Sequence, residues 1–168
     1  MRLHGGLLEQ ARHLLTLDPG RPREASLRRA ISAAYYALFH LLIFEASKML
    51  VNDESLRLLV SRAFVHGEMQ RCSKSFAAGN IPQKFDPIVA QAAITQQLKD
   101  VAQTFVSLQQ ARHDADYNLA RRFKRREATA LVEQAERAFA NWQACRDDPC
   151  SRLYLSCLLL WERFDKIR

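Results

Sequence analysis

The sequence contains few of the residues that interrupt helices. Only five glycines and five prolines occur in 168 residues, and they gather in a few short segments. The long stretches between them are rich in Ala, Leu, Gln, Glu and Arg, which favour the α-helix. We therefore predict an all-α chain, and its length suits one domain with a sizeable core.

Several chemical motifs are also missing. The four cysteines have neither CxxC spacing nor a neighbouring histidine, which argues against a zinc site or a redox dithiol. They are Cys72, Cys145, Cys150 and Cys157. We interpret them as reduced thiols, with a disulfide between Cys145 and Cys150 as the alternative. The chain has no Ser/His/Asp order, HExxH motif, P-loop or glycine fingerprint. We therefore predict no metal ion and no cofactor.

Long apolar runs and a secretory signal are absent as well. The most apolar run, Ala30 to Phe44, is interrupted by Ser32 and His40. It is shorter than the roughly 18 to 20 residues that a bilayer span needs. The N-terminus does not have the pattern of a signal peptide. These features predict a buried helix, no membrane partner and a cytoplasmic location.

The charge of the chain is one-sided. Lys and Arg together number 25 against 18 for Asp and Glu, which gives a formal net charge of +7 and a pI of about 9.6. A basic surface favours polyanions, although net charge concerns association and not fold.

Apolar periodicity and the position of helix-breaking residues predict the helices. They cover Leu7 to Leu17, Pro22 to Leu50, Glu54 to Val65 with a further piece to Phe76, Asp86-Pro87 to the region of Arg112, Arg126 to the Asp147-Asp148-Pro149 segment, and Cys150 to Arg168. Ala78 to Asp86 has no periodicity and is predicted to be a surface loop.

The second of these helices is apolar on more than one face. Its main stripe is flanked by Tyr35, Phe39 and Leu42 on one side and by Tyr36, Ile43 and Ala46 on the other. Such a helix needs neighbours all round. It either lies at the centre of the bundle or meets a second copy of the chain, and we expect some of both.

The segment from Arg112 to Tyr117, RHDADY, breaks the apolar periodicity. Arg112 and Asp116 are four residues apart, as are His113 and Tyr117, so on a helix the two polar pairs would face one groove. An Arg112–Asp116 salt bridge would orient the guanidinium. The alternative interpretation is a helix end and a solvated turn with Tyr117 half-buried.

The following segment, Arg121 to Arg126, has five basic residues around Phe123. Basic residues at the start of a helix are unfavourable because they meet the positive end of its dipole. An anionic partner would offset this, and cations beside an aromatic ring suit single-stranded RNA. A solvated run of charge is the other interpretation.

Two of these segments resemble a known family. Ala30 to Leu42, AISAAYYALFHLL, is similar to the A-x-x-x-YYAxFH helix of HEPN-domain proteins, in particular a bacterial branch of uncharacterised proteins, with Tyr35, Tyr36 and His40 as the motif residues. RHDADY resembles the R-x-x-ADY signature of the same domain. Ala63 to Met69 adds a looser likeness, and the resemblance spans about Leu3 to Ala144.

The resemblance implies an up-down helical bundle of four to five core helices over residues 1–146, with residues 147–168 as a C-terminal helical extension packed on the same domain. It also implies a homodimer in which the arginine motifs of two subunits line a shared cleft, with RNA as the ligand or substrate. Arg112 would contact phosphate, Asp116 would orient it, and Tyr117 would pack or stack. The cleft would also include Arg121, Arg122, Lys124 and Arg125.

The sequence departs from the pattern of the family's ribonucleases. Those enzymes carry a histidine four to six residues beyond the arginine, where this chain has Tyr117, Asn118 and Leu119. Metal-independent RNA cleavage needs a proton acceptor near the ribose 2′-OH, and an unperturbed tyrosine titrates too high. His113 is then the only local acid or base. The two functional hypotheses are a toxin-like domain that binds or cleaves RNA, and a non-catalytic interaction module that pairs with a nucleotidyltransferase-type antitoxin or another partner, with Tyr117 as a site of modification.

Overall fold

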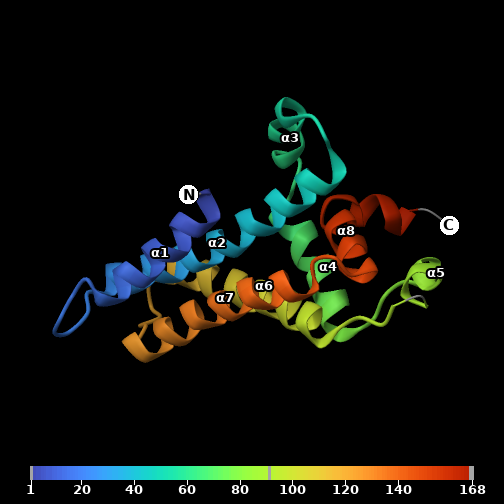
Figure 1. The fold of residues 1–168 in the computed structure, drawn as a ribbon. Helices are drawn as coiled ribbons and strands as arrows, with labels where there is room; N and C mark the ends of the chain where they lie inside the picture. The colour runs from blue at the N-terminus through green and yellow to red at the C-terminus, as the bar shows by residue number, and fades with distance from the viewer. Residues whose placement is uncertain (1, 91, 167–168) are drawn as a thin grey trace. The chain divides into compact units, whose positions relative to one another are not determined.

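The chain is an all-α helical bundle, as the sequence predicts. The computed structural model describes residues 2–90 and 92–166, apart from the side chains of Val89 and Asp165, and this part contains no strand (Figure 1). The helices are α1 (Leu3–Thr16), α2 (Glu24–Leu50), α3 (Glu54–Ser61), α4 (His66–Ala78), the 3-10 helix η1 (Gln83–Phe85), α5 (Asp86–Val89), α6 (Gln96–Tyr117), α7 (Arg125–Cys145) and α8 (Pro149–Lys166).

These helices form two compact units, and the chain passes from one to the other within α2, α6 and α7. Unit 1 comprises Met1–His40 and Thr104–Ala140, and unit 2 comprises Leu41–Gln103 and Asn141–Arg168. Unit 1 therefore holds α1, the first part of α2, the last part of α6 and most of α7. It contains all the sequence-predicted functional residues.

In unit 1 the apolar residues of α2 are buried on more than one side, as predicted. The main stripe is fully enclosed, with Leu27, Ile31, Ala34 and Leu38 at most 1% exposed. Tyr35 is also fully buried, and its ring centroid lies 5.6 Å from that of Phe105 on α6. Tyr36 and His40 are only half-buried. They form an accessible strip between enclosed residues in the middle of the helix, whereas Ala25 and Arg29 are exposed nearer its start.

The apolar run Ala30 to Phe44 was expected to be too short for a membrane span, but the whole of α2 is long enough for one. The helix has 27 residues and includes an 18-residue window with a mean hydropathy of 1.3, so by length and composition it could cross a membrane. Within that window 78% is buried by the rest of the protein. A central core helix passes the same test of length and composition, because it too must be apolar on all sides.

In unit 2 the core forms where α8 packs on α4. The Tyr154 ring lies 4.9 Å from that of Phe76, and the Tyr154 hydroxyl is 2.8 Å from the Ser73 hydroxyl. All of Ser73, Phe76 and Tyr154 are fully buried. The four cysteines are free and buried, and burial raises the pKa of the Cys145 and Cys150 thiols. The C-terminal segment is thus helical, as predicted.

Replacing Tyr154 by phenylalanine is expected to lower the free energy of unfolding by about 1 to 2 kcal/mol, because the Ser73 hydroxyl loses its partner in the interior. Urea denaturation measures the change. Tyr117→Phe is the matched control, since Tyr117 is 66% exposed, and it should leave the stability unchanged. Adding Ser73→Ala to Tyr154→Phe should recover part of the loss. Equal stability of Tyr154→Phe and the wild type would contradict a stabilising role for this hydrogen bond.

The predicted helix from Asp86 to the Arg112 region is wrong in its first part. Asp86 and Pro87 start a helix, but α5 ends after four residues, and Ala90, which follows it, is exposed. Helix α6 begins separately after Thr95, whose hydroxyl caps it by accepting a hydrogen bond from the Leu98 N–H at 3.3 Å. The reason for the break is tertiary, because the segment before it packs on α8, with Phe85 5.3 Å from Phe164.

Other boundaries shift by a turn or less. Helix α1 begins at Leu3 and not at Leu7, α3 ends at Ser61 and not at Val65, and α4 continues to Ala78. Gly79 ends α4 in the left-handed region at φ 71, which favours glycine because other residues are strained there. The predicted loop after it includes η1, with Phe85 buried.

Candidate functional site

The motif Arg112 to Tyr117 forms the last turns of α6, and its first pair is the predicted one. Arg112 Nη1 lies 3.4 Å from Asp116 Oδ2, as an ion pair between residues four apart. A third partner comes from α2, because the Ser32 hydroxyl donates to Asp116 Oδ1 at 2.6 Å. Asp116 is therefore held from two sides, which fixes the direction in which it pulls the guanidinium.

The Arg112 guanidinium is enclosed by aromatic rings. It lies 5.3 Å from the centre of the Tyr35 ring, 5.9 Å from Tyr36 and 6.0 Å from Tyr117, all within cation–π range. Its side chain is only 13% exposed. Burial acts to lower the pKa of Arg112, but Tyr36 and the hydrogen bond to Asp116 act to raise it, and the pKa is raised overall. The group stays charged at every physiological pH.

One part of this arrangement opposes stability. Arg112 Nε is buried and has no hydrogen-bond partner among the described residues. A buried donor without an acceptor is unfavourable, and native proteins contain few of them. Packing alone would favour a smaller apolar residue at this position. The enclosed cation is therefore a candidate for function.

The second predicted pair points outward. The His113 and Tyr117 rings lie 5.2 Å apart, both side chains are exposed, and Tyr117 is 66% exposed. The alternative expectation of a half-buried Tyr117 is wrong. An exposed tyrosine thus stands beside a fixed arginine. We call Arg112, His113, Asp116 and Tyr117 the motif surface.

The two sequence motifs meet at this place. Tyr36 lies between the Arg112 guanidinium and His40, whose ring is stacked 6.3 Å from the Tyr36 ring. Burial lowers the pKa of His40, so its imidazole is neutral at neutral pH. The fully buried Tyr35 ring contacts the same Arg112 guanidinium from the interior of the protein. The motif residues of α2 therefore support and border the motif surface.

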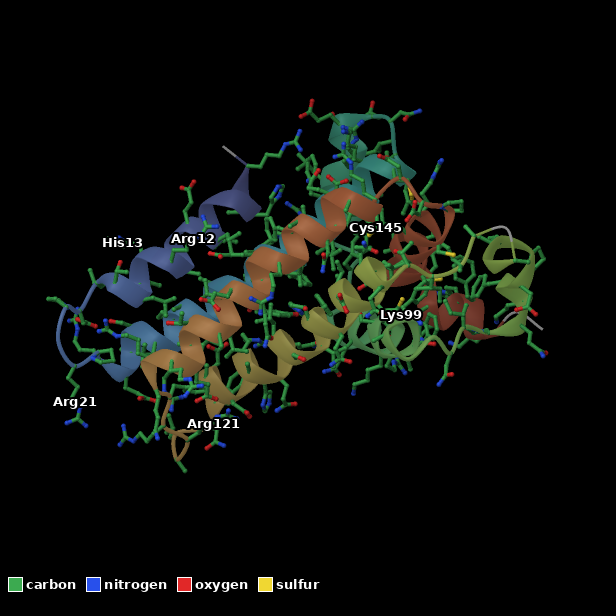
Figure 2. The ribbon with its side chains drawn as sticks, turned by 60° about the horizontal axis from the view of Figure 1, so that its bottom comes forward. Arg12, His13, Arg21, Lys99, Arg121 and Cys145 are labelled. Carbon is green, nitrogen blue, oxygen red and sulfur yellow. The ribbon has the colours of Figure 1, made fainter. Side chains whose placement is uncertain are left out.

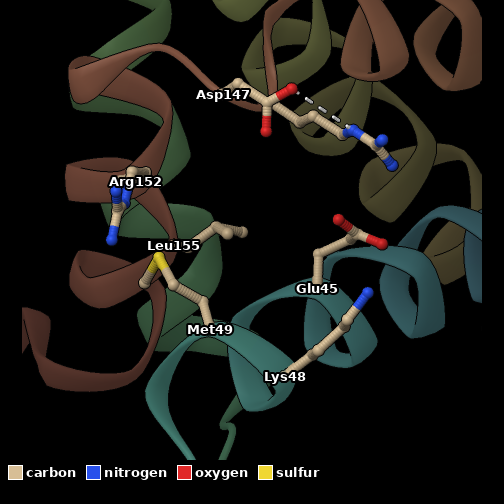
Figure 3. A pocket seen from close by; sticks show the side chains of 7 residues that line it. Glu45, Lys48, Met49, Asp147, Arg152 and Leu155 are labelled. Atoms are coloured by element: carbon tan, nitrogen blue, oxygen red, sulfur yellow. Dashed lines mark ion pairs between the residues drawn. The ribbon is translucent and has the colours of Figure 1, made fainter.

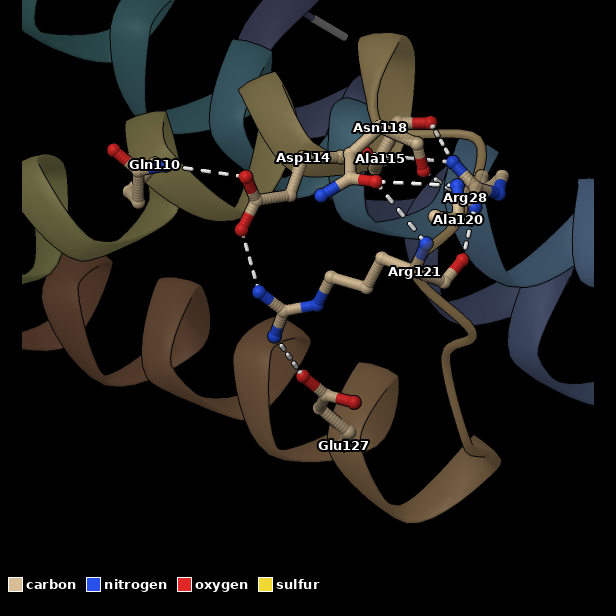
Figure 4. A network of polar contacts seen from close by, with 8 residues as sticks. All are labelled: Arg28, Gln110, Asp114, Ala115, Asn118, Ala120, Arg121 and Glu127. Carbon is tan, nitrogen blue, oxygen red and sulfur yellow. Dashed lines mark hydrogen bonds and ion pairs between the residues drawn. The ribbon is translucent and has the colours of Figure 1, made fainter.

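Arg28 holds the end of α6, a role that no pattern in the sequence predicts. The guanidinium donates to four backbone carbonyls at the end of α6 and in the segment after it, namely those of Ala115 (2.6 Å), Asn118 (3.1 Å), Asp114 (3.4 Å) and Arg121 (Figure 4). It also pairs with Glu24 at 3.0 Å. The last carbonyls of a helix lack internal partners, and a cation is favourable there. Arg28 thus fixes the turn that carries Tyr117.

The basic segment after α6 separates into bound and unbound charges. Arg121 pairs with Asp114 and Glu127 (Figure 4), while Arg125 donates to the carbonyls of Asp18 and Gly20. These two side chains stabilise the fold. They are therefore not free to contact RNA, as the prediction of a basic cleft required. The cations that remain exposed, without an ion pair or hydrogen bond to the described residues, are Arg122, Lys124 and Arg126.

Phe123 does not act as predicted. It is 4% exposed and lies beneath Arg28 and Arg121, whose guanidinium carbons are 5.4 Å and 4.8 Å from its ring centre. A base cannot stack on a buried ring. Tyr117, not Phe123, is the accessible aromatic of this region.

Unit 2 contains a concave region of a different character (Figure 3). Its cavity of about 410 Å³ is lined by Glu45, Lys48, Met49, Arg146, Asp147, Arg152 and Leu155. Arg146 Nε lies 3.7 Å from Asp147 Oδ2. Charges of both signs alternate around this cavity, so it does not favour one class of ligand.

Searches against family models, curated proteins and solved structures give no match. In the part of the chain that the structure describes, no group of three or more His, Cys, Asp or Glu side chains could hold a metal ion. The function must therefore be inferred from the geometry of the motif surface and its surroundings.

Proposed function

We propose that this protein binds single-stranded RNA at the motif surface. The observation that supports the proposal is the exposed Tyr117 ring beside the fixed Arg112 cation. Sequence-tolerant recognition of single strands combines bases stacked on aromatic rings with cations that contact the phosphates. The net charge of +7 favours the same class of ligand.

We also propose that the functional form is a homodimer, in which two motif surfaces face one cleft. The accessible strip of Tyr36 and His40 borders this surface on α2. Gel filtration with light scattering at micromolar concentration tests the assembly. A monomer would remove the shared cleft and leave a single-sided binding surface.

RNA cleavage at this surface would require a proton acceptor close to the ribose 2′-OH. His113 is exposed and adjoins Tyr117, so it is the first candidate. Labelled RNA incubated with the protein in the presence of a chelator tests this step. Cleavage that disappears in both Arg112→Ala and His113→Ala identifies a metal-independent ribonuclease. Binding without cleavage identifies an RNA-binding domain.

Replacing Tyr117 by alanine is expected to weaken binding of a short single-stranded RNA by about 5- to 100-fold, because a base–aromatic stack contributes roughly 1 to 3 kcal/mol. Tyr117→Phe keeps the ring and should keep most of the affinity. Fluorescence anisotropy with a labelled oligonucleotide measures both. An alanine variant that binds as well as the wild type would refute stacking.

The same pair of variants tests the second candidate function, a protein-interaction module whose partner contacts or modifies Tyr117. The exposed hydroxyl favours this alternative. A function that depends on that hydroxyl fails in Tyr117→Phe as fully as in Tyr117→Ala. A nucleotidyltransferase-type antitoxin is the partner to test, by co-purification and by mass spectrometry of Tyr117.

A further inference from the structure

A basic pocket lies in unit 1 where two connecting segments meet. Its cavity of about 660 Å³ is lined by Arg21, Pro22, Glu24, Arg122, Phe123, Lys124 and Arg125. One wall is the loop between α1 and α2, and the other is the segment between α6 and α7. Figure 2 shows Arg21 on the first and Arg121 on the second, at the same end of the unit. The volume is in the range of small-molecule sites, roughly 300 to 1,000 Å³.

Hydrogen bonds hold the two walls together. The Arg125 guanidinium donates to the carbonyls of Asp18 and Gly20, the latter at 2.9 Å. In the opposite direction, the Phe123 N–H donates to Glu24 Oε1 at 3.2 Å. Because each segment is bonded to the other, the pocket exists before a ligand arrives, and less ordering is needed on binding.

The charge in the pocket is positive and largely unpaired. Glu24 is the one acidic lining residue, and its carboxylate already pairs with Arg28 at 3.0 Å. Arg21, Arg122 and Lys124 are exposed and have neither an ion pair nor a hydrogen bond to other described residues. Like charges brought together without a counter-ion repel one another, and an anion between them removes that repulsion.

The N-terminus of α7 adds to this field. Helix α7 begins at Arg125, which lines the pocket, whereas the start of α2 already holds the Asp18 carboxylate, whose Oδ2 accepts a hydrogen bond from the Arg23 N–H at 3.0 Å. The first N–H groups of a helix lack internal acceptors and carry positive partial charge, which suits an anion. Arg125 and Arg126 in the first turn of α7 are unfavourable there unless an anion is bound.

We infer that this pocket binds the phosphate group of a phosphate monoester, such as the terminal phosphate of an RNA strand. A monoester carries close to two negative charges at neutral pH, whereas an internal phosphodiester carries one. Three unpaired cations and the N-terminus of α7 match the dianion better. The assignment of the phosphate to an RNA end rests on the proposed function, whereas affinity for phosphate itself does not.

Inorganic phosphate titrated into the isotopically labelled full chain tests the pocket directly by NMR. The expected result is saturable shifts of the backbone amides of Arg21, Arg23, Glu24 and residues 122–125. These shifts should be lost in the double variant Arg122→Gln, Lys124→Gln. Both side chains are exposed and unpaired, so the fold should be unchanged, which circular dichroism checks. Arg29→Gln and Arg137→Gln, combined, are the control with the same change in charge outside the lining, and they should bind as the wild type does.

Paired oligonucleotides identify the source of the phosphate. An RNA with a 5′-phosphate is expected to bind about 10- to 100-fold more tightly than the same RNA with a 5′-hydroxyl, because charge-assisted hydrogen bonds contribute roughly 1.5 to 3 kcal/mol. The ratio should fall to about one in the double variant and persist in Tyr117→Ala. A 3′-phosphate and a nucleoside monophosphate test the other monoester sources.

Three outcomes would overturn the inference. Linear, unsaturable shifts spread over all basic residues would reduce the pocket to a solvated patch. A control double variant that loses as much phosphate affinity as the pocket variant would do the same. Equal affinity for every RNA end, with binding still lost in the pocket variant, would assign the pocket to an internal phosphodiester. If no RNA binds, the proposed function fails while the phosphate titration still decides the pocket.

Discussion

Replacing Arg28 by alanine is expected to lower the free energy of unfolding by about 3 kcal/mol, because it removes one partner of a part-buried ion pair and a hydrogen-bond donor from four backbone carbonyls. The Arg28 side chain is 15% exposed, and Glu24 would remain in place without its cation. The carbonyls at the end of α6 would lose their only side-chain donor among the described contacts. Urea denaturation followed by circular dichroism measures the change.

The neighbouring arginine provides a matched control. Arg29 is exposed and has no ion pair or hydrogen bond to the described residues, so Arg29→Ala should change the stability by less than about 0.5 kcal/mol. Arg28→Lys keeps the charge, but the lysine ammonium group cannot contact several carbonyls at once as the planar guanidinium does. This variant should therefore lose about half as much free energy of unfolding as Arg28→Ala. Equal effects of Arg28→Ala and Arg29→Ala would show that the carbonyl network contributes nothing.

Arg28 is a positioning residue under the proposed function, because it fixes the turn that ends in Tyr117 and does not itself form the motif surface. Arg28→Lys should therefore bind RNA more weakly than the wild type. Tyr117→Ala should also cost less RNA affinity when it is combined with Arg28→Lys than when it is introduced alone. Independent, additive effects of the two substitutions would argue against positioning, since coupled residues give non-additive changes.

Replacing Arg112 by alanine is expected to weaken RNA binding by about 10- to 100-fold, the loss of a charge-assisted contact to phosphate. Arg112→Lys should recover only part of the affinity, because an ammonium group lacks the planar face that lies against the tyrosine rings while Nη1 pairs with Asp116. In a salt titration, the slope of the logarithm of RNA affinity against the logarithm of salt concentration should become shallower by about one when a phosphate contact is lost.

A charge control separates this site from the general basic character of the chain. Arg137→Ala removes the same charge from an exposed position on α7, where the side chain is 64% exposed and its pair with Glu133 is long, at 3.9 Å. It should alter affinity only slightly. Loss of affinity equal to that of Arg112→Ala would mean that net charge, not the motif surface, governs binding. Thermal unfolding of each variant confirms that the comparison is between folded proteins.

The sequence predicted the contacts that depend on spacing along one helix. The pairs Arg112–Asp116 and His113–Tyr117 form as expected, because side chains four residues apart lie on the same face of a helix. The buried residues of α2 follow from the same periodicity. The end of α6 near the motif also follows, because apolar residues cease to recur at that point.

Contacts between distant segments could not be read in this way. Arg28 and Arg29 are adjacent and identical, yet one binds four carbonyls about ninety residues away and the other faces solvent. The RNA interpretation of the segment Arg121 to Arg126 needed an accessible Phe123, but two arginines cover its ring. The start signal at Asp86 was genuine, but packing of that segment on α8 limited it to a short helix.

The amino-acid sequence by itself determined that this protein is all-α, which residues of α2 are enclosed, and which side chains of RHDADY pair along α6. Those features arise from local propensity and helical periodicity, which act within a few residues. Only the tertiary structure decided which cations are bound to carbonyls and which are free, and that two loops close a basic pocket. These contacts depend on where distant parts of the chain meet. Two identical residues at neighbouring positions therefore cannot be distinguished from the sequence.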